Sequence, residues 1–130
     1  MSELFQNLLR DPQSYIDGDY FAGHALTREQ IEAVHLAGLR KRFEELRKQV
    51  PVLERLATEQ GIEAIESLDD AVPLLFPHTV YKSYPQSILE RGQFDRLTRW
   101  LDGLTTLDLR KVDTAGVDSI DGWIKRLDEQ

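Results

Sequence analysis

Apolar positions recur at helical spacing through the second quarter of the chain. Three or four positions separate successive members of one apolar set, namely Leu36, Leu39, Phe43, Leu46 and Val50. This spacing places the side chains on a single stripe of an α-helix. Thr27 precedes the stretch and Gln30 follows three positions later, which is the capping-box pattern of a helix start. The pattern therefore predicts a helix over residues 28–50.

A second helix is predicted directly after the first. Pro51 disfavours helical geometry at Val50, but proline is well suited to the first turn of a new helix. Gly61 supplies a left-handed cap for that new helix. We therefore expect a long kinked helix pair over about residues 28–60.

The N-terminal quarter combines a short helical pattern with an irregular stretch. Leu4, Leu8 and Leu9 have helical spacing, and Asp11-Pro12 closes that segment. Residues 13–26 contain several aromatic and glycine residues without a clear period. We expect an ordered loop there, packed by its aromatic side chains.

The segment after Gly61 is divided by prolines. Ser67 predicts the start of a short helical turn that extends through Val72. Pro73, Pro77 and Pro85 exclude a long regular element over residues 73–85. Another short helical piece over residues 86–91 is predicted to stop at Gly92.

The last third of the chain predicts two further helices. Residues 93–101 are amphipathic and end before Gly103, and Thr106 is a candidate cap for a brief turn. Ser119 is the predicted cap of the final helix, whose inward residues we expect to be Ile120, Trp123, Ile124 and Leu127. Trp100 and Trp123 are predicted core residues. No stretch has the period-two alternation of a strand, so the predicted fold is all-α, an irregular helical bundle forming a single domain over residues 1–130.

The composition and net charge exclude several classes of site and partner. The 130 residues suffice for one hydrophobic core. The chain has no cysteine, which excludes disulfides and thiolate metal sites. A net charge of −7 repels phosphate backbones, so we expect no nucleic-acid partner. No apolar run approaches the ~20 residues that span a bilayer, and no signal-peptide pattern is present. We expect a cytoplasmic protein that does not enter the membrane.

The histidines do not form a metal-binding pattern. Ligands on one helix must lie three or four positions apart to point in one direction. His35 has only Glu32 at such a distance, and His24 and His78 are isolated in predicted loops. We expect no metal site.

A complete set of catalytic groups is likewise missing from the sequence. Asp69 and Asp70 are adjacent, so on a helix their side chains diverge by about 100°. Their better explanation is that negative charge favours a helix start. The eight glycines form neither a Gly-x-Gly-x-x-Gly nor a Walker pattern. We expect no catalytic, cofactor-binding or metal-binding residue and no cofactor in this chain.

Helical periodicity does not explain the segment HTVYKSY, residues 78–84. His78, Tyr81, Lys82 and Tyr84 are therefore the candidate interface or ligand-facing residues. The Lys82 ammonium could serve as a point charge for a carboxylate or phosphate. The alternative is a packed connection whose lysine extends to water, and packing is favoured.

The helical stripe from Leu36 to Val50 also has two interpretations. It can pack within the chain or contribute to a helix–helix homodimer. The spacing holds for about two heptads, fewer than the three or four typical of a coiled coil. Packing within the chain is therefore favoured.

The order of motifs in residues 39–85 resembles the N-terminal region of adenylate-forming acyl/aryl-CoA ligases of the phenylacetate–CoA ligase type. The family has a helix ending at a proline step, a helix with a terminal glycine, an Ile-x-Ser-Leu-x-Asp turn, a proline step, and a Thr/Lys segment ending in aromatic-Pro. The matching residues in this chain are Val50-Pro51, Gly61-Ile62, Ile65 to Asp70, Leu75-Phe76-Pro77, and Thr79 through Lys82 to Tyr84-Pro85. The resemblance covers about a third of the chain.

The resemblance implies a parent enzyme that uses ATP and Mg to activate a carboxylic acid and then transfers it to a thiol such as CoA. The family's phosphate-binding loop and nucleotide core have no counterpart before Gln130. We therefore expect a non-catalytic N-terminal module of a larger ligase, which packs on the catalytic core or dimerises it. The alternative is a stand-alone helical adaptor that binds another protein.

Overall fold

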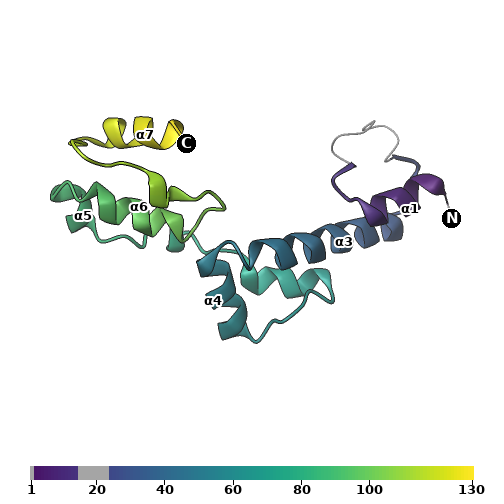
Figure 1. Cartoon of the computed structure of the whole chain (residues 1–130). Helices are drawn as coiled ribbons and strands as arrows, with labels where there is room; N and C mark the ends of the chain where they lie inside the picture. The colour runs from purple at the N-terminus through teal and green to yellow at the C-terminus, as the bar shows by residue number, and fades with distance from the viewer. Residues whose placement is uncertain (1, 15–23) are drawn as a thin grey trace. The chain divides into compact units, whose positions relative to one another are not determined.

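The computed structural model describes residues 2–14 and 24–130, and all regular structure within those ranges is helical (Figure 1). The all-α prediction is confirmed. The predicted aromatic loop over residues 13–26 falls largely outside the described residues. The chain divides into two compact units. Unit 1 comprises Met1–Lys48 and Leu56–Leu75, and unit 2 comprises Gln49–Arg55 and Phe76–Gln130. A single domain over residues 1–130 stays a prediction.

Unit 1 begins with helix α1 (Glu3–Arg10), which packs against the long helix α3 (Arg28–Leu46). The Ser2 hydroxyl caps α1 by accepting a hydrogen bond from the Phe5 amide at 3.3 Å. Phe5 and Leu8 lie on one face of α1 and are buried against Leu26 and Val34. The predicted first helix is confirmed, and its apolar face forms the core of this part of unit 1.

The capping box at the start of α3 is confirmed. The Gln30 amide donates to the Thr27 hydroxyl at 3.3 Å, and the Thr27 amide donates to Oε1 of Gln30 at 2.9 Å. The helix ends at Leu46, so its predicted end at residue 50 is wrong by four residues. Residues 47–49 form a turn instead, because Pro51 disfavours helical geometry at the preceding residue and the chain leaves the helix one turn earlier.

The predicted apolar stripe of α3 is buried only in part. Phe43 and Val50 are buried, Leu36 and Leu46 are half-buried, and Leu39 is exposed. Because the stripe is only partly buried, α3 has an exposed apolar surface beside the face that packs within unit 1.

Helix α4 (Pro51–Gln60) and its predicted glycine cap are confirmed. Gly61 has a φ of +68°. Glycine adopts this left-handed region without a Cβ clash. The Ile62 amide donates to the Ala57 carbonyl at 2.9 Å, and the Gly61 amide donates to the Thr58 carbonyl at 3.1 Å. These two bonds form a Schellman motif.

Two arginines of α3 and its C-terminal turn fix the connection after α4. Arg40 donates from Nε to the Ile65 carbonyl at 2.7 Å and from Nη2 to the Glu66 carbonyl at 3.1 Å. Arg47 donates from Nη1 to the Glu63 carbonyl at 2.8 Å. Ile65, whose carbonyl accepts one of these bonds, is itself buried at 2% exposure.

The predicted turn at Ser67 is a 3-10 helix, η2 (Leu68–Leu74), and it extends two residues beyond the predicted end at Val72. One carboxylate oxygen of Asp70 accepts from the amides of Glu66 and Ser67, each at 2.8 Å. These hydrogen bonds lower the pKa of Asp70, with the Ser67 amide as the main cause. Asp69 and Asp70 are predicted to favour a helix start through their negative charge, and Asp70 has this role in the structure.

Unit 2 is built around helix α6 (Phe94–Asp102). Its other elements are η3 (Val80–Lys82), α5 (Gln86–Glu90), η4 (Leu109–Lys111) and α7 (Ile120–Asp128) (Figure 1). The Ser119 hydroxyl caps α7 as predicted, by accepting from the Gly122 amide at 3.1 Å. The brief turn predicted at Thr106 is η4, and Asp108 rather than Thr106 is its cap.

The buried centre of unit 2 consists of Phe94, Leu97 and Trp123. Trp100 is half-buried, so the core prediction is correct for Trp123 and only partly correct for Trp100. The prediction that Ile120 and Ile124 point inward is wrong, because they are 50% and 45% exposed. The four apolar positions of α7 span a wide arc, and the contact with α6 covers only the side that carries Trp123.

Candidate functional site

The predicted site residues lie in unit 2, on the connection that leads into α5. A short turn forms because the Val80 amide donates to the Pro77 carbonyl at 2.9 Å. The Ser83 hydroxyl donates to the Val80 carbonyl at 2.7 Å and closes the following turn. Local hydrogen bonds therefore hold the segment, because its prolines exclude a long regular element.

Tyr84 serves packing. Its ring meets the Trp100 ring edge-on, with centroids 4.8 Å apart and an interplanar angle of 72°. Such an edge-to-face arrangement is one that aromatic pairs prefer. The Trp100 indole N–H donates to the Ser83 hydroxyl at 2.8 Å. Tyr84 and Ser83 together anchor the connection to α6, and this role agrees with the packed-connection alternative.

His78, Tyr81 and Lys82 face solvent. Tyr81 is 57% exposed, and its ring centroid lies 6.2 Å from that of Phe76. Among the described residues, no hydrogen bond or ion pair joins His78, Tyr81 or Lys82 to another side chain. A nucleophile needs a base within hydrogen-bond reach, and no such pair exists here within the described part of the chain. The arrangement can offer a cation and a phenol to a partner surface.

No group of three or more potential metal ligands comes together anywhere in residues 2–14 and 24–130. The candidate site lacks a carboxylate or a second imidazole beside His78, which a cation site would require. Its chemistry is limited to recognition through aromatic contact, hydrogen bonding and one positive charge.

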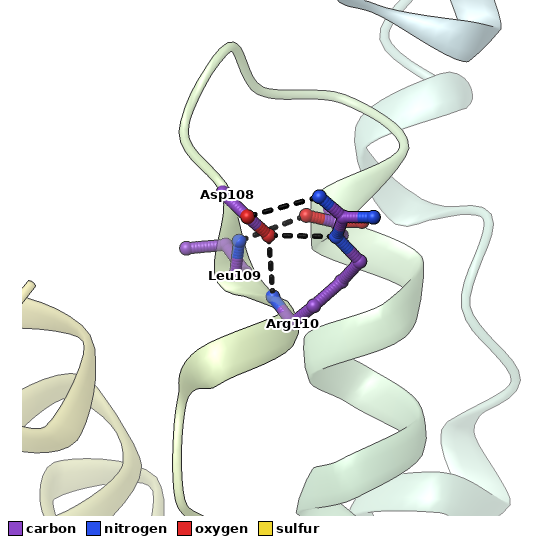
Figure 2. A network of polar contacts seen from close by, with 4 residues as sticks. Asp108, Leu109 and Arg110 are labelled. Atoms are coloured by element: carbon purple, nitrogen blue, oxygen red, sulfur yellow. Dashed lines mark hydrogen bonds and ion pairs between the residues drawn. The ribbon is translucent and has the colours of Figure 1, made fainter.

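A polar network at the end of α6 was missed by sequence reasoning (Figure 2). Asp108 accepts from Arg110 Nε at 2.8 Å and Nη2 at 3.0 Å, and from the Arg110 amide at 3.1 Å. The guanidinium, and then the amide, lower the pKa of Asp108 to about 2. The Leu109 amide donates to Asp102 Oδ1 at 2.9 Å. The Asp102 bond ties η4 to α6 and holds buried Leu109 in place, and the Asp108–Arg110 bonds close η4 itself, so the network is structural.

A groove along α3 in unit 1 was also missed. Its volume is about 760 Å³, which is in the range of ligand sites. Its apolar lining comes from three separate parts of unit 1, namely Pro12, Val34, Gly38, Leu39 and Leu68. Its polar lining consists of Gln13, His35, Lys41, Arg42 and Glu45. The exposed Leu39 lies in this groove, but its exposure is known only from the structure, so the sequence alone does not reveal the groove.

No protein-family model, curated protein or solved structure matches this chain. In the part of the chain that the structure describes, no helix combines the length and apolar character needed to cross a membrane.

Proposed function

We propose that this chain is a non-catalytic helical module of an ATP-dependent acyl- or aryl-activating ligase that packs on the enzyme's catalytic core. The observation that carries the proposal is the order of motifs from Pro51 to Pro85. Several of these motifs have a defined structural role in the fold. Pro51 begins α4, Gly61 ends it, and the Asp70 carboxylate accepts from the amide of Ser67, the residue that caps η2. The ligase resemblance thus rests on residues that shape the backbone.

The exposed apolar residues in the same part of the chain support a packing role. Leu75 is 70% exposed and Val72 is 61% exposed, and both lie in unit 1. Single exposed apolar residues are ordinary, but two within four positions favour a surface that a partner covers. Within the proposal, the catalytic core of the ligase covers this stretch.

The candidate residues have a specific role in this proposal. Tyr81 and Lys82 contact the core, where the lysine supplies a positive charge and the tyrosine an aromatic surface. Tyr84 keeps the segment attached to α6 through its contact with Trp100. ATP, Mg and CoA bind to the core, and the cytoplasm supplies them.

The proposal is tested by immunoprecipitating the endogenous protein with an antibody against residues 28–60. The precipitate is assayed for ATP–pyrophosphate exchange with a panel of aryl and acyl carboxylic acids. We expect exchange in the precipitate and none with the purified 130-residue chain. Exchange by the purified chain would overturn the non-catalytic role, and a precipitate inactive with every acid would overturn the ligase assignment.

A second candidate function, a stand-alone adaptor for another protein, is favoured by exposed apolar residues outside the ligase-like segment. Leu107, Ile120 and Ile124 are all exposed in unit 2. The same immunoprecipitation distinguishes the two functions, because mass spectrometry identifies what is recovered. A stoichiometric partner without pyrophosphate-exchange activity would favour the adaptor.

A further inference from the structure

We propose that helix α7 of a second copy of this chain docks in the α3 groove. Two described surfaces, one in each unit, carry apolar residues that are exposed to solvent, and neither depends on the ligase proposal. The first surface is the groove that Leu39 and Leu68 line. The second is the ridge formed by Ile120 and Ile124, which we name the α7 ridge.

The groove suits a helix of the size of α7. Its α3 lining extends from Val34 to Glu45, eleven positions further along the chain. At a rise of about 1.5 Å per residue, this separation corresponds to about 16 Å of helix. Helix α7 has nine residues and is therefore about 14 Å long. An amphipathic helix that lays its apolar face in a groove uses anchors at positions i and i+4, which is the spacing of Ile120 and Ile124.

The α7 ridge is exposed to solvent in the part of the chain that the structure describes. Trp123 faces the core of its own unit, which turns Ile120 and Ile124 toward solvent at 50% and 45% exposure. At about 100° per residue, Asp121 and Asp128 lie on the flank of the ridge. The ridge is thus apolar with an acidic edge.

The polar lining of the groove complements that edge. Lys41 lines the groove and makes no hydrogen bond or ion pair with any residue that the structure describes. Arg42 lies 3.8 Å from Glu45 in an exposed pair, so Lys41 is the cation left for a partner carboxylate. The chain's net charge of −7 otherwise opposes self-association. Complementary charge at this contact fixes orientation and raises the association rate.

Each copy carries one groove and one ridge, so only a closed assembly fills every groove. The smallest closed assembly that does so is a twofold dimer. We therefore expect a dimer in solution, with Leu39 of one copy close to Ile124 of the other.

The first experiment measures mass against concentration by sedimentation velocity for the whole chain and its variants. We expect the wild type to dimerise and I124D or K41E to raise the dimer dissociation constant at least about tenfold. The matched controls L107D and K48E change exposed residues outside both surfaces and should dimerise like the wild type. Combining K41E with D128K reverses both charges and should restore part of the lost affinity. Circular dichroism of each variant verifies that the helices remain folded.

The second experiment uses the absence of native cysteine. Separate L39C and I124C chains are mixed and oxidised, so that a 39–124 disulfide can form only between copies. We expect this heterodisulfide in clear excess over the product of an L39C and L107C mixture. A wild type that stays monomeric at near-millimolar concentration would overturn the proposal. A dimer that is insensitive to both I124D and K41E, or that lacks the 39–124 crosslink, would overturn it equally.

Discussion

The indole nitrogen of Trp123 donates a hydrogen bond to the hydroxyl of Thr98 at 2.9 Å, in the buried centre of unit 2. The same hydroxyl donates to the Phe94 carbonyl at 2.7 Å, one turn earlier in α6. One threonine therefore satisfies the only polar group of the tryptophan side chain that closes the core, and it fixes where α7 contacts α6.

Replacing Thr98 with valine keeps the shape of the side chain and removes the hydroxyl that accepts from the Trp123 indole. The buried indole N–H then loses its partner, and we expect the free energy of unfolding to fall by about 1–3 kcal/mol. Urea denaturation measures the loss. Thr98→Ser keeps the hydroxyl and should be milder, and the exposed T106V should remain within about 0.5 kcal/mol of the wild type. Equal stability of T98V and T106V would contradict this role of the hydroxyl.

The two tryptophans should differ in access to solvent. Trp123 is buried, whereas Trp100 is half-buried and bonds to the exposed Ser83. W100F leaves Trp123 as the only tryptophan of the chain, and W123F leaves Trp100, so each can be excited selectively over the tyrosines. We expect acrylamide to quench Trp100 more strongly, and Trp123→Ala to cost about 3–5 kcal/mol against a smaller cost for Trp100→Ala. The reverse order in either measurement would show that the centre of unit 2 lies elsewhere.

Two helix starts and one helix end could be predicted because their causes are local. The capping box of Thr27, the left-handed Gly61 and the Ser119 cap each act within three to five residues of sequence. The buried face of α7 depends instead on how much of it α6 covers. That contact joins residues far apart in sequence. The apolar character of Ile124 predicts an inward position, because it does not show how much of α7 the contact with α6 covers.

The position of the candidate site along the chain could be predicted, but the arrangement of its residues could not. Prolines and aromatics marked residues 78–84 as irregular, and the structure keeps His78, Tyr81 and Lys82 at the surface. The α3 groove could not be predicted, because Pro12, Gly38 and Leu68 meet only after folding. A single sequence carries no signal for such a meeting of separate segments.

Substitutions at Gly61 measure the free-energy cost of a left-handed backbone conformation separately from any effect on packing. A Cβ built at Gly61 meets no atom within 4 Å, yet the residue has a φ of +68°. This conformation is unfavourable for an L-residue, so we expect Gly61→Ala to destabilise unit 1 by about 1 kcal/mol and Gly61→Asn by less. Thermal unfolding measures both. Gly38→Ala lies in the interior of a right-handed helix and should not destabilise, so a loss as large as that of G61A would refute the conformational explanation.

The Asp108–Arg110 network predicts a change in stability at acid pH. The folded pKa of Asp108 is about 2, below the ordinary 3.8, so the ionised carboxylate favours the folded chain. Its contribution is full above about pH 4 and disappears as the pH falls toward about 2. The stability difference between the wild type and D108N should therefore shrink over this window in urea titrations. Carbon-detected NMR of R110Q should show the Asp108 pKa rising toward its ordinary value, and an unchanged pKa would contradict the role of the guanidinium.

Arg40 should control the local stability of the segment that follows α4. Its guanidinium bonds to the carbonyls of Ile65 and Glu66 with two different nitrogens, a fork that lysine cannot reproduce. We expect Arg40→Lys to speed hydrogen exchange at the Ser67 amide about tenfold, which corresponds to about 1.4 kcal/mol, with little change in global unfolding.

The matched control for Arg40→Lys is Arg42→Lys, because Arg42 pairs only with the exposed Glu45 among the described residues. Exchange at Ser67 should not change in that variant. Leu68 lines the α3 groove directly after this amide, so loosening the segment should also weaken the proposed dimer. If R40K leaves exchange at Ser67 as slow as in the wild type, the two arginine bonds do not hold the segment, and its position depends on the burial of Ile65 instead.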